Sequence, residues 1–320
     1  FNIGYEVSQR ILHGVIHYAQ EHPDIVLRDY NFSRETLDLP EPPPWMGKAD
    51  GLLMNLGRDP GVGDWLRRGG VPVVNTGGDL ASEKRVVSVF TDPRSVASLA
   101  VRHFLDLGRQ QFAFVGDRRA DATKLLQQAM AEELAKHGLH LQTYGAKTVY
   151  SGTFEDFDSL KEVEPGLVRL IRKARKPLAL LAQTDRYAAA ICRVVEFLGL
   201  AIPEDVGVVG VHDTEMARLS TPPISSVRPA HQLIGYQAAR LLHRLLRGQR
   251  LARRIVLLPA LKLVERGSTI QKPRAAQTDV QRSLDYIREH VTDGIGIQDV
   301  ADHVHIPRCT FQAEFAAAVG

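Results

Sequence analysis

The sequence predicts an α/β body with parallel sheets, followed by a short all-α segment. Three observations support this division. Up to about Arg266, short apolar runs alternate with amphipathic stretches, which is the pattern of βαβ units. Residues 271–277 (QKPRAAQ) are polar and contain a proline, and neither a strand period nor a helix period runs through them. After them the pattern changes to short amphipathic helices with a tight connection.

Seven apolar runs are the predicted strands of the α/β body. Runs of this length, separated by helical patterns, are typical of a parallel sheet that is covered on both faces. The predicted strands are residues 25–27, 51–54, 71–75, 86–90, 111–115, 178–182 and 206–211.

Four amphipathic stretches between these runs are predicted helices. The second of them has the clearest end signals, because Asp92 is a suitable N-cap, Pro93 takes the first helical position and Gly108 follows the last turn. The four helices are residues 8–21, 93–107, 185–198 and 232–246.

The segment after the predicted linker at 271–277 reads as a helix-turn-helix, which we expect to occupy residues 278–320. Residues 280–290 form the first predicted helix, 297–304 the second, and a third starts at 305–307 and runs to Val319. Seven apolar residues have the spacing of a packed core and are given no binding role: Ile297, Val300, Ala301, Val304, Ile306, Phe311 and Phe315.

Bulk composition indicates a globular protein without a membrane span. The chain has 320 residues, 44% of them hydrophobic and 24% charged, and a formal charge of +3, which does not by itself identify a nucleic-acid binder. Cys192 and Cys309 are far apart and lack metal-binding spacing, so we expect a reduced, cytoplasmic protein. No apolar run approaches the roughly 20 residues that span a bilayer, and residues 1–4 do not resemble a signal peptide.

Enzyme chemistry has no support in the motifs. The sequence contains no dinucleotide-binding, P-loop, nucleophile-elbow or zinc-protease pattern. We therefore expect neither catalysis nor a cofactor or metal.

Several short motifs occur in a fixed order along the chain. They are residues 1–2 with Ile11-Leu12-x-Gly14, then 50–53, 71–75, 89–92, 112–116, 184–185, 202–211, 222–227 and 263–269. In this order they resemble a known combination, in which a LacI-like sensor of periplasmic-binding-protein type is fused to an AraC-type DNA-binding domain, as in bacterial xylose-operon regulators. The resemblance covers almost the whole chain.

The resemblance implies two Rossmann-like lobes hinged around a small-molecule cleft in residues 1–270. The family's first strand would end near Phe1, and AraC-type domains carry two helix-turn-helix motifs, so we expect a truncated first strand and an incomplete DNA-binding domain ending at Gly320. The implied partners are operator DNA, reached by the full-length protein, and a small-molecule effector, with a homodimer as the active form.

Candidate ligand residues follow from the rule that bilobed α/β folds bind ligands beyond the carboxyl ends of their strands. A sugar site needs side chains that both donate and accept hydrogen bonds. The candidates are Asn2, Ser8, Asn75, Arg118, Arg119, Asp185, His212 and Asp213.

Each of these residues also has a simpler interpretation. Asp185 either caps the helix that it precedes or contacts ligand. Arg118 and Arg119 are read as solvated loop charges, one of which could reach the cleft. Asp213 follows a buried strand and is favoured as a ligand contact. The resemblance places an Asp at the position of His212, so the expected pentose competes with an anionic sugar derivative or with a role in protein interaction.

Four polar residues of the second region are candidate DNA contacts. Arg308, Thr310 and Gln312 lie near the start of the predicted recognition helix, where Arg and Gln can reach guanine and adenine edges, and Gln298 can touch phosphate. The region from Gln271 carries five Lys or Arg against seven Asp or Glu, which is opposite to the usual charge of a DNA-binding surface. A helical interaction module is therefore kept as an alternative. An exported sugar-binding protein is a separate alternative, because it would share the architecture of the sensor.

Overall fold

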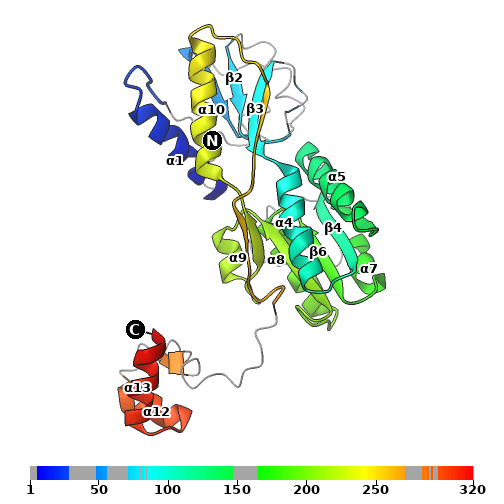
Figure 1. The fold of residues 1–320 in the computed structure, drawn as a ribbon, viewed down its shortest axis with the longest axis vertical. Helices are drawn as coiled ribbons and strands as arrows, with labels where there is room; N and C mark the ends of the chain where they lie inside the picture. The colour runs from blue at the N-terminus through cyan, green and yellow to red at the C-terminus, as the bar shows by residue number, and fades with distance from the viewer. Residues whose placement is uncertain are drawn as a thin grey trace. The chain divides into compact units, whose positions relative to one another are not determined.

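The computed structural model describes residues 6–28, 48–55, 71–79, 81, 83, 85–146, 165–270, 283, 284, 286, 287, 290 and 295–319. The chain divides into two compact units, Phe1–Ile270 and Gln271–Gly320. The first unit contains two sheets, one in each of two lobes (Figure 1).

The N-terminal lobe is a parallel sheet with two helices on one face (Figure 1). Buried side chains of α10, Ile234, Ala238 and Leu241, pack on Val74 and Val89 of the sheet, and α1 packs on α10. The strand order is β1-β2-β3-β9. The elements are α1 (Glu6–Gln20), β1 (Leu52–Met54), β2 (Val73–Asn75), β3 (Val86–Thr91), β9 (Ile255–Leu258) and α10 (His231–Leu246).

Two glycines fix the contact between α1 and α10. A Cβ atom on Gly14 would lie 1.8 Å from the carbonyl oxygen of Gln232, and one on Gly235 would lie 1.8 Å from the carbonyl oxygen of Ile11. The two helix backbones therefore touch at a distance that only glycine permits. Val15, Tyr18 and Ala239 close the seam beside this contact.

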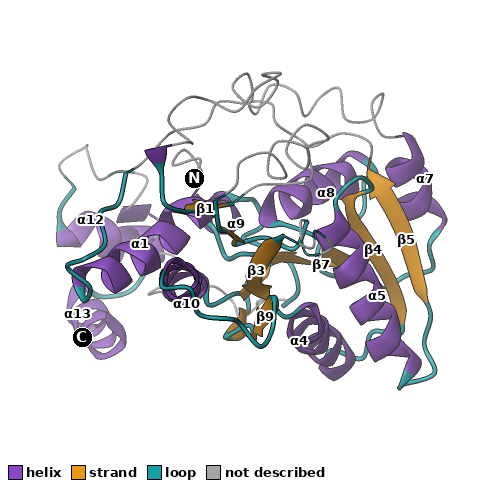
Figure 2. Cartoon of the chain, turned by 90° about the horizontal axis from the view of Figure 1, so that it is seen from above, coloured by secondary structure: helices purple, strands orange, loops and turns teal. Residues whose placement is uncertain are grey.

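The C-terminal lobe is a larger sheet with strand order β10-β8-β7-β6-β4-β5. Helices α4 and α5 cover one face and α7 and α8 cover the other (Figure 2), and a buried apolar cluster fills each interface. The elements are α4 (Pro93–Asp106), β4 (Gln111–Asp117), α5 (Asp121–Ala135), β5 (Leu141–Ala146), α7 (Pro165–Lys173), β6 (Leu178–Ala182), α8 (Asp185–Phe197), β7 (Val206–Val211), α9 (Glu215–Leu219), β8 (Ser225–Arg228) and β10 (Lys262–Val264).

The backbone crosses between the lobes in three segments, which are hydrogen bonded to one another. The N–H of Asp92 donates to Leu258 O (2.8 Å), and the N–H of Leu261 donates to Arg228 O (2.8 Å). These bonds join the connections β3–α4, β9–β10 and β8–α10 into one hinge region.

The second unit holds α12 (Ile297–Val304) and α13 (Arg308–Val319), joined by a tight turn at His305, whose φ is 60°. Val300, Ala301, Val304 and Phe311 form its buried core.

Six of the seven predicted strands and all four predicted helices of the body lie at the expected positions, within a few residues at each end. The prediction of a strand at residues 25–27 is wrong. The N–H of Ile25 closes a turn on His22 O (3.0 Å), and Val26 is 79% exposed. The sheets are also not wholly parallel, because β10 runs antiparallel to β8.

One core assignment in the second unit is wrong as well. Ile297 is 37% exposed, and Ile295 packs against the core instead. The turn before α12 thus supplies the apolar contact that the first residue of the helix does not make.

No helix in the described part of the chain is long and apolar enough to cross a membrane.

Candidate cleft between the two lobes

A cavity of about 260 Å³ lies between the lobes, next to the hinge region. It opens at the carboxyl ends of β2, β6 and β7, where loops converge and polar groups are free of the sheet ladder. Its volume lies just below the usual range of small-ligand pockets, so the ligand that it fits is small. Seven polar side chains are among its lining residues: Asn55, Thr76, Asp79, Thr91, Gln183, His212 and His231.

The cavity walls combine these polar groups with apolar surface. Phe90 and Ile11 come from the N-terminal lobe, and Val96, Leu126 and Val211 come from the C-terminal lobe. None of the described lining residues is Arg or Lys. The arrangement suits a small ligand with hydroxyl groups on some faces and C–H groups on others.

Asp79 reaches from the N-terminal lobe to the start of α5. Its Oδ1 accepts from the N–H of Ala122 (2.8 Å), which joins the two lobes along one wall. Burial raises the pKa of Asp79, and the hydrogen bond from Ala122 opposes that shift. Opposite it, Gln183 Oε1 accepts from the N–H of Asp117 (2.8 Å), so the Gln183 amide nitrogen can donate to a ligand.

His212 and His231 form a pair of imidazoles on the cavity wall. Nδ1 of His212 lies 3.2 Å from Nε2 of His231, and the rings stack with centroids 5.3 Å apart. Burial, together with the charge of Arg10, lowers the pKa of His212 to about 4. Burial, with His212 and Arg10 beside it, lowers the pKa of His231 to about 2. Both rings are therefore neutral near pH 7, one donating to the other.

Asp213 points into the protein and does not line the cavity. Its side chain is fully buried, and its carboxylate accepts from Arg266 Nη2 (2.5 Å) and Arg228 Nε (2.6 Å). Burial alone would raise the pKa of Asp213, but the hydrogen bonds from the two arginines bring it below its ordinary value. Asp213, which was favoured as a ligand contact, is thus bound by two arginines of the protein itself.

Asp185 is also buried, and it ties the start of α8 to the neighbouring strands. Its Oδ2 accepts from the N–H (2.7 Å) and the hydroxyl (2.8 Å) of Thr214, and Ser226 donates to Oδ1. Burial raises the pKa of Asp185 to about 6. Thr184, not Asp185, is the N-cap of α8. Neither a helix-cap role nor a place in the cavity lining is seen for Asp185.

The other predicted ligand residues lie at varying distances from the cavity. Ser8 is buried and accepts from Asn55 Nδ2 (3.2 Å), so it supports a lining residue. Asn75 is buried and donates to Gly77 O (3.1 Å), in the loop that carries Asp79. Arg118 and Arg119 are exposed and outside the lining. Asn2 lies outside the described residues.

Six polar lining residues were missed by reasoning from the sequence, and five of them carried a signal. Thr91 is the last residue of β3. Asn55, Thr76, Asp79 and Gln183 each follow a strand within a few residues, which is where the strand-end rule directs attention. His231 is different. It is the first residue of α10, and only the hinge brings it beside His212.

In the second unit the four predicted DNA contacts are all exposed: Gln298, Arg308, Thr310 and Gln312. Arg308 is the first residue of α13, and Gln298 donates to Asp302 Oδ1 (2.8 Å) on its own helix. In the described residues, no group of three His, Cys, Asp or Glu side chains is arranged to hold a metal ion.

A family model described as a periplasmic binding protein-like domain matches residues 101–269, slightly more than half of the chain. The chain belongs to the periplasmic binding protein-like family. In this periplasmic binding protein-like chain, the matched region takes in most of the C-terminal lobe, together with α10 and β9.

Curated relatives of this periplasmic binding protein-like chain are transcription regulators. The xylose operon regulatory protein of Escherichia coli (strain K12) is 28% identical over 327 residues, which cover 100% of this chain and 81% of the relative. The protein of the same name from Haemophilus influenzae is 25% identical over 326 residues, 98% of this chain and 80% of the relative. CelR of Thermobifida fusca, an HTH-type transcriptional regulator, is 30% identical over 199 residues, 60% of this chain and 55% of the relative.

Solved structures confirm the predicted bilobed α/β fold. A xylose-binding transcription activator has a TM-score of 0.67 at 24% identity, covering 98% of this chain and 80% of that chain. The regulator CelR in complex with cellobiose has a TM-score of 0.64 at 24% identity, covering 82% of this chain and 79% of that chain.

Proposed function

We propose that this protein is a ligand-responsive, sequence-specific DNA-binding transcription regulator, and that its effector is a small neutral sugar such as xylose. The observation that carries the proposal is the cavity between the lobes, where polar donors and acceptors, with no lysine or arginine among the described lining residues, lie beside apolar wall at the strand ends. The xylose operon regulatory proteins, which are similar over nearly the whole chain, support the same function.

The charges around the cavity favour a neutral sugar over an anionic one. Arg118 and Arg119 are exposed and outside the lining, and the pKa of His212 is lowered to about 4. An anionic ligand would therefore meet neutral imidazoles and the Asp79 carboxylate, with no lysine or arginine among the described lining residues to compensate its lost hydration.

DNA binding is assigned to the second unit. The proposal divides the chain into a sensing domain at 1–270, a linker at 271–277 and an AraC-type helix-turn-helix domain at 278–320; the linker lies outside the described residues. The support is the pair α12 and α13 with a small packed core, and the exposure of Arg308, Thr310 and Gln312.

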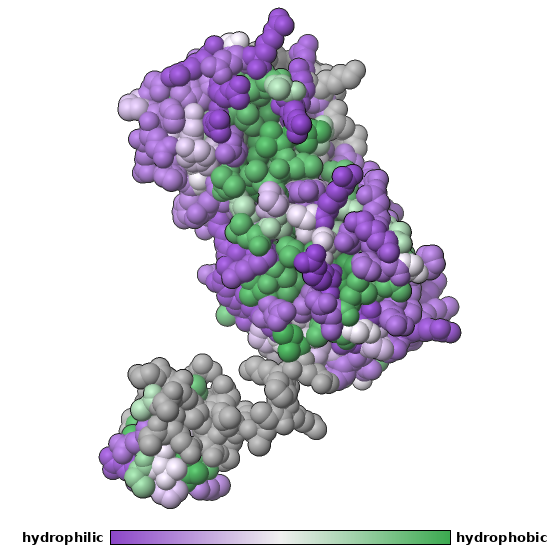
Figure 3. All heavy atoms as spheres, viewed as in Figure 1, coloured by the Kyte–Doolittle hydropathy of each residue, from purple (hydrophilic) through white to green (hydrophobic). Residues whose placement is uncertain are grey.

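A homodimer is part of the same proposal. Apolar side chains gather on one face of the first unit, over β9 and the segment that follows it (Figure 3). Ile255, Leu257 and Leu261 there are 42%, 45% and 62% exposed. A repressor crystallised as an operator-bound dimer, the lac repressor, has a TM-score of 0.61 at 19% identity, which supports the fold only. A Leu257→Glu variant should sediment as a smaller species than the wild type if this face joins two copies.

Thermal unfolding with a matched set of ligands tests the effector class. D-xylose should raise the unfolding midpoint of the 320-residue chain, and xylonate, which differs by its carboxylate, should not. Asp79→Asn should weaken the xylose response, whereas Arg118→Gln is the matched exposed control and should leave it unchanged. A response to xylonate alone would reject the neutral effector.

Operator binding tests the second unit separately. Selection of bound sites from random duplexes supplies the DNA. Arg308→Gln should relax the preference at one base position at a cost of about 1–3 kcal/mol, while Arg118→Gln should not. Equal binding of all duplexes by the wild type would contradict sequence-specific recognition.

A further inference from the structure

The loop from His212 to Glu215, called here the coupling loop, contacts three parts of the first unit at once. The ring of His212 lines the cavity. The loop backbone is held by α1 of the other lobe, and the Asp213 carboxylate is held by the segment that leads out of the unit.

Side chains of helix α1 are hydrogen bonded to the backbone of the coupling loop. Arg10 Nη1 donates to His212 O (3.0 Å) and Arg10 Nη2 donates to Asp213 O (2.9 Å). The N–H of Glu215 donates to Glu6 Oε2 (2.7 Å), and Glu6 also forms an ion pair with Arg10. The interlobe contact is thus made by two side chains one helical turn apart, acting on three of the four residues of the loop.

The exit segment, residues 264–270, is bound by the side chain of Asp213 in the coupling loop. Arg266 donates to Asp213 Oδ1 through Nη2 (2.5 Å) and to Ile224 O through Nη1 (2.8 Å). Two residues later, Ser268 Oγ donates to Val208 O (2.5 Å) and accepts from the N–H of Ser225 (2.8 Å). Gln271, where the second unit begins, follows directly after this segment.

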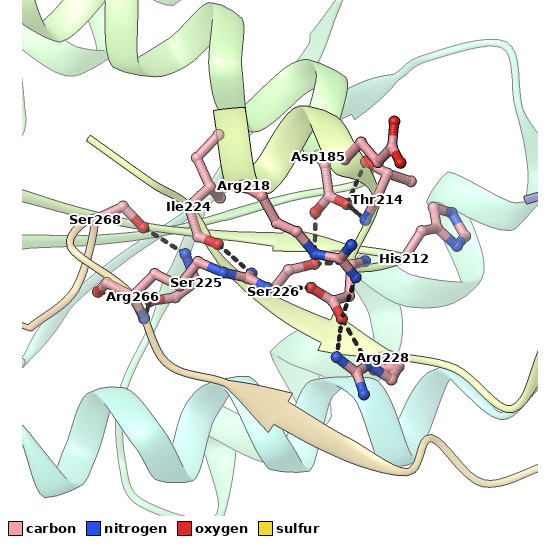
Figure 4. Close-up of polar contacts among 12 residues, drawn as sticks. Asp185, His212, Thr214, Arg218, Ile224, Ser225, Ser226, Arg228, Arg266 and Ser268 are labelled. Atoms are coloured by element: carbon pink, nitrogen blue, oxygen red, sulfur yellow. Dashed lines mark hydrogen bonds and ion pairs between the residues drawn. The ribbon is translucent and has the colours of Figure 1, made fainter. Parts of the chain in front are cut away.

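The backbone of the coupling loop sends its two key side chains in different directions. His212 has φ of 101° and Asp213 has φ of 50°, values that L-residues rarely adopt. Figure 4 shows the His212 ring pointing away from Arg228 and Arg266. The loop therefore presents one face to the cavity and the other to the arginines, in a conformation that its neighbours must maintain.

We propose that the coupling loop transmits the contact between the lobes to the exit segment, with Arg10 and Asp213 as its positioning residues. Opening the lobes moves Arg10 and Glu6 away from the loop. The loop then loses the groups that hold its unfavourable backbone, and Asp213 loosens its hold on Arg266. The proposal rests on the proposed function, since it gives the route from ligand-controlled closure to the segment that precedes the DNA-binding unit.

Hydrogen exchange of the full chain, measured by mass spectrometry without any ligand, tests the transmission directly. Arg10→Gln removes both contacts of α1 with the loop carbonyls. We expect exchange to rise at least about three-fold in peptides covering residues 212–215 and also in those covering 264–270. The amides of Ser268 and Thr269 are hydrogen bonded and report on the exit segment.

Three controls separate transmission from general destabilisation. His13→Gln changes an exposed residue on the same helix and should alter neither peptide. Peptides from β6, which is buried along its whole length, should keep wild-type exchange in Arg10→Gln. Arg10→Lys keeps a charge near the loop but only a single donor group, so it should give an intermediate rise. A rise at 212–215 without one at 264–270 would overturn the proposal.

A variant at the exit segment and added D-xylose distinguish a failure of this inference from a failure of the proposed function. Arg266→Gln leaves every described lining residue in place, and it should raise exchange at 212–215 because coupling is reciprocal. With D-xylose added, the wild type should gain protection at both peptides. If xylose gives no protection but Arg10→Gln still loosens 264–270, the effector assignment fails and the transmission stands. If xylose protects 212–215 alone, the transmission fails and the sensor stands.

Discussion

Helix α1 makes two kinds of contact, and they differ in what they can tolerate. One face meets α10 through glycines whose backbones touch, with apolar side chains around them. The first two turns of the helix meet the coupling loop through the side chains of Glu6 and Arg10, which reach carbonyl and N–H groups of the other lobe. The contact between α1 and α10 fixes the distance between the two helices. The contact with the coupling loop can break and form again without disturbing a core.

This difference assigns each contact a role in lobe motion. Because α1 and α10 are locked together, Glu6 and Arg10 move with the whole N-terminal lobe. In the proposed lobe motion, the polar contact is therefore the part of α1 that changes. Four predictions test this contrast, from the largest expected effect to the smallest.

Gly235→Ala should unfold the N-terminal lobe. The added Cβ would lie 1.8 Å from Ile11 O, so α1 and α10 must separate along their whole seam, and we expect a loss of at least about 5 kcal/mol. Urea denaturation followed by circular dichroism measures it. Gly296→Ala is the control, because a Cβ there meets nothing closer than 3.6 Å. A cooperative transition near the wild-type midpoint would show that the seam is not rigid.

Asp213→Asn should cost about 3–5 kcal/mol, because two arginines lose the buried carboxylate that they share. The matched control is Asp117→Asn at the end of β4, a buried carboxylate whose ion-pair partner Arg119 is 57% exposed. We expect that control to cost about 1 kcal/mol or less. Equal losses in the two variants, measured by urea denaturation, would mean that the arginine cluster adds nothing beyond ordinary burial of a carboxylate.

Comparison of these two aspartates shows how far the sequence alone could lead. The strands before Asp117 and Asp213 were predicted from their apolar runs, and the strand-end rule located the right edge of the sheet. Local sequence does not show which way a side chain points from a loop with positive φ, or that Arg228 and Arg266 fold back on one of the two carboxylates. Those partners are distant in sequence, and only the packed fold brings them together.

The same limit explains the cavity. Asn55, Asp79 and Gln183 follow strands, so the rule could have included them. His231 opens a helix after the hinge and has no local signal. Arg118 and Arg119 also follow a predicted strand, but both side chains are exposed, as expected for solvated loop charges. Residue type and strand position together identify the edge of the sheet where the cavity lies, while burial decides which residues at that edge line it.

Acid should lower the free energy of unfolding through the imidazole of His212, the residue whose carbonyl oxygen accepts from Arg10. The pKa of His212 is about 4 in the folded protein and about 6.5 in the unfolded chain, so the unfolded state binds more protons between these values. The contribution of His212 to stability is therefore full above about pH 6.5 and falls by about 3 kcal/mol as the pH drops to 4, and His231, whose pKa is lowered to about 2, adds a loss of the same sign.

The measurement is the difference in unfolding free energy between the wild type and His212→Asn across this range. Asp185 titrates in the same window with the opposite sign, since its pKa is raised to about 6, and the difference between the two proteins cancels its contribution. A difference that does not change with pH would mean that His212 is hydrated in the folded state.

Glu6→Gln should have the smallest effect on stability. The side chains of Glu6 and Arg10 are 28% and 24% exposed, and Gln can still accept from the N–H of Glu215, so we expect a loss of about 0.5–1 kcal/mol. Glu132→Gln removes a more exposed ion pair with Arg94 and serves as the control. A loss near that of Gly235→Ala would show that both contacts of α1 are structural. A small loss accompanied by weaker ligand protection at residues 212–215 would separate them, since it would show that the polar contact acts on the open and closed states of the cleft and the glycine seam acts on the folded state as a whole.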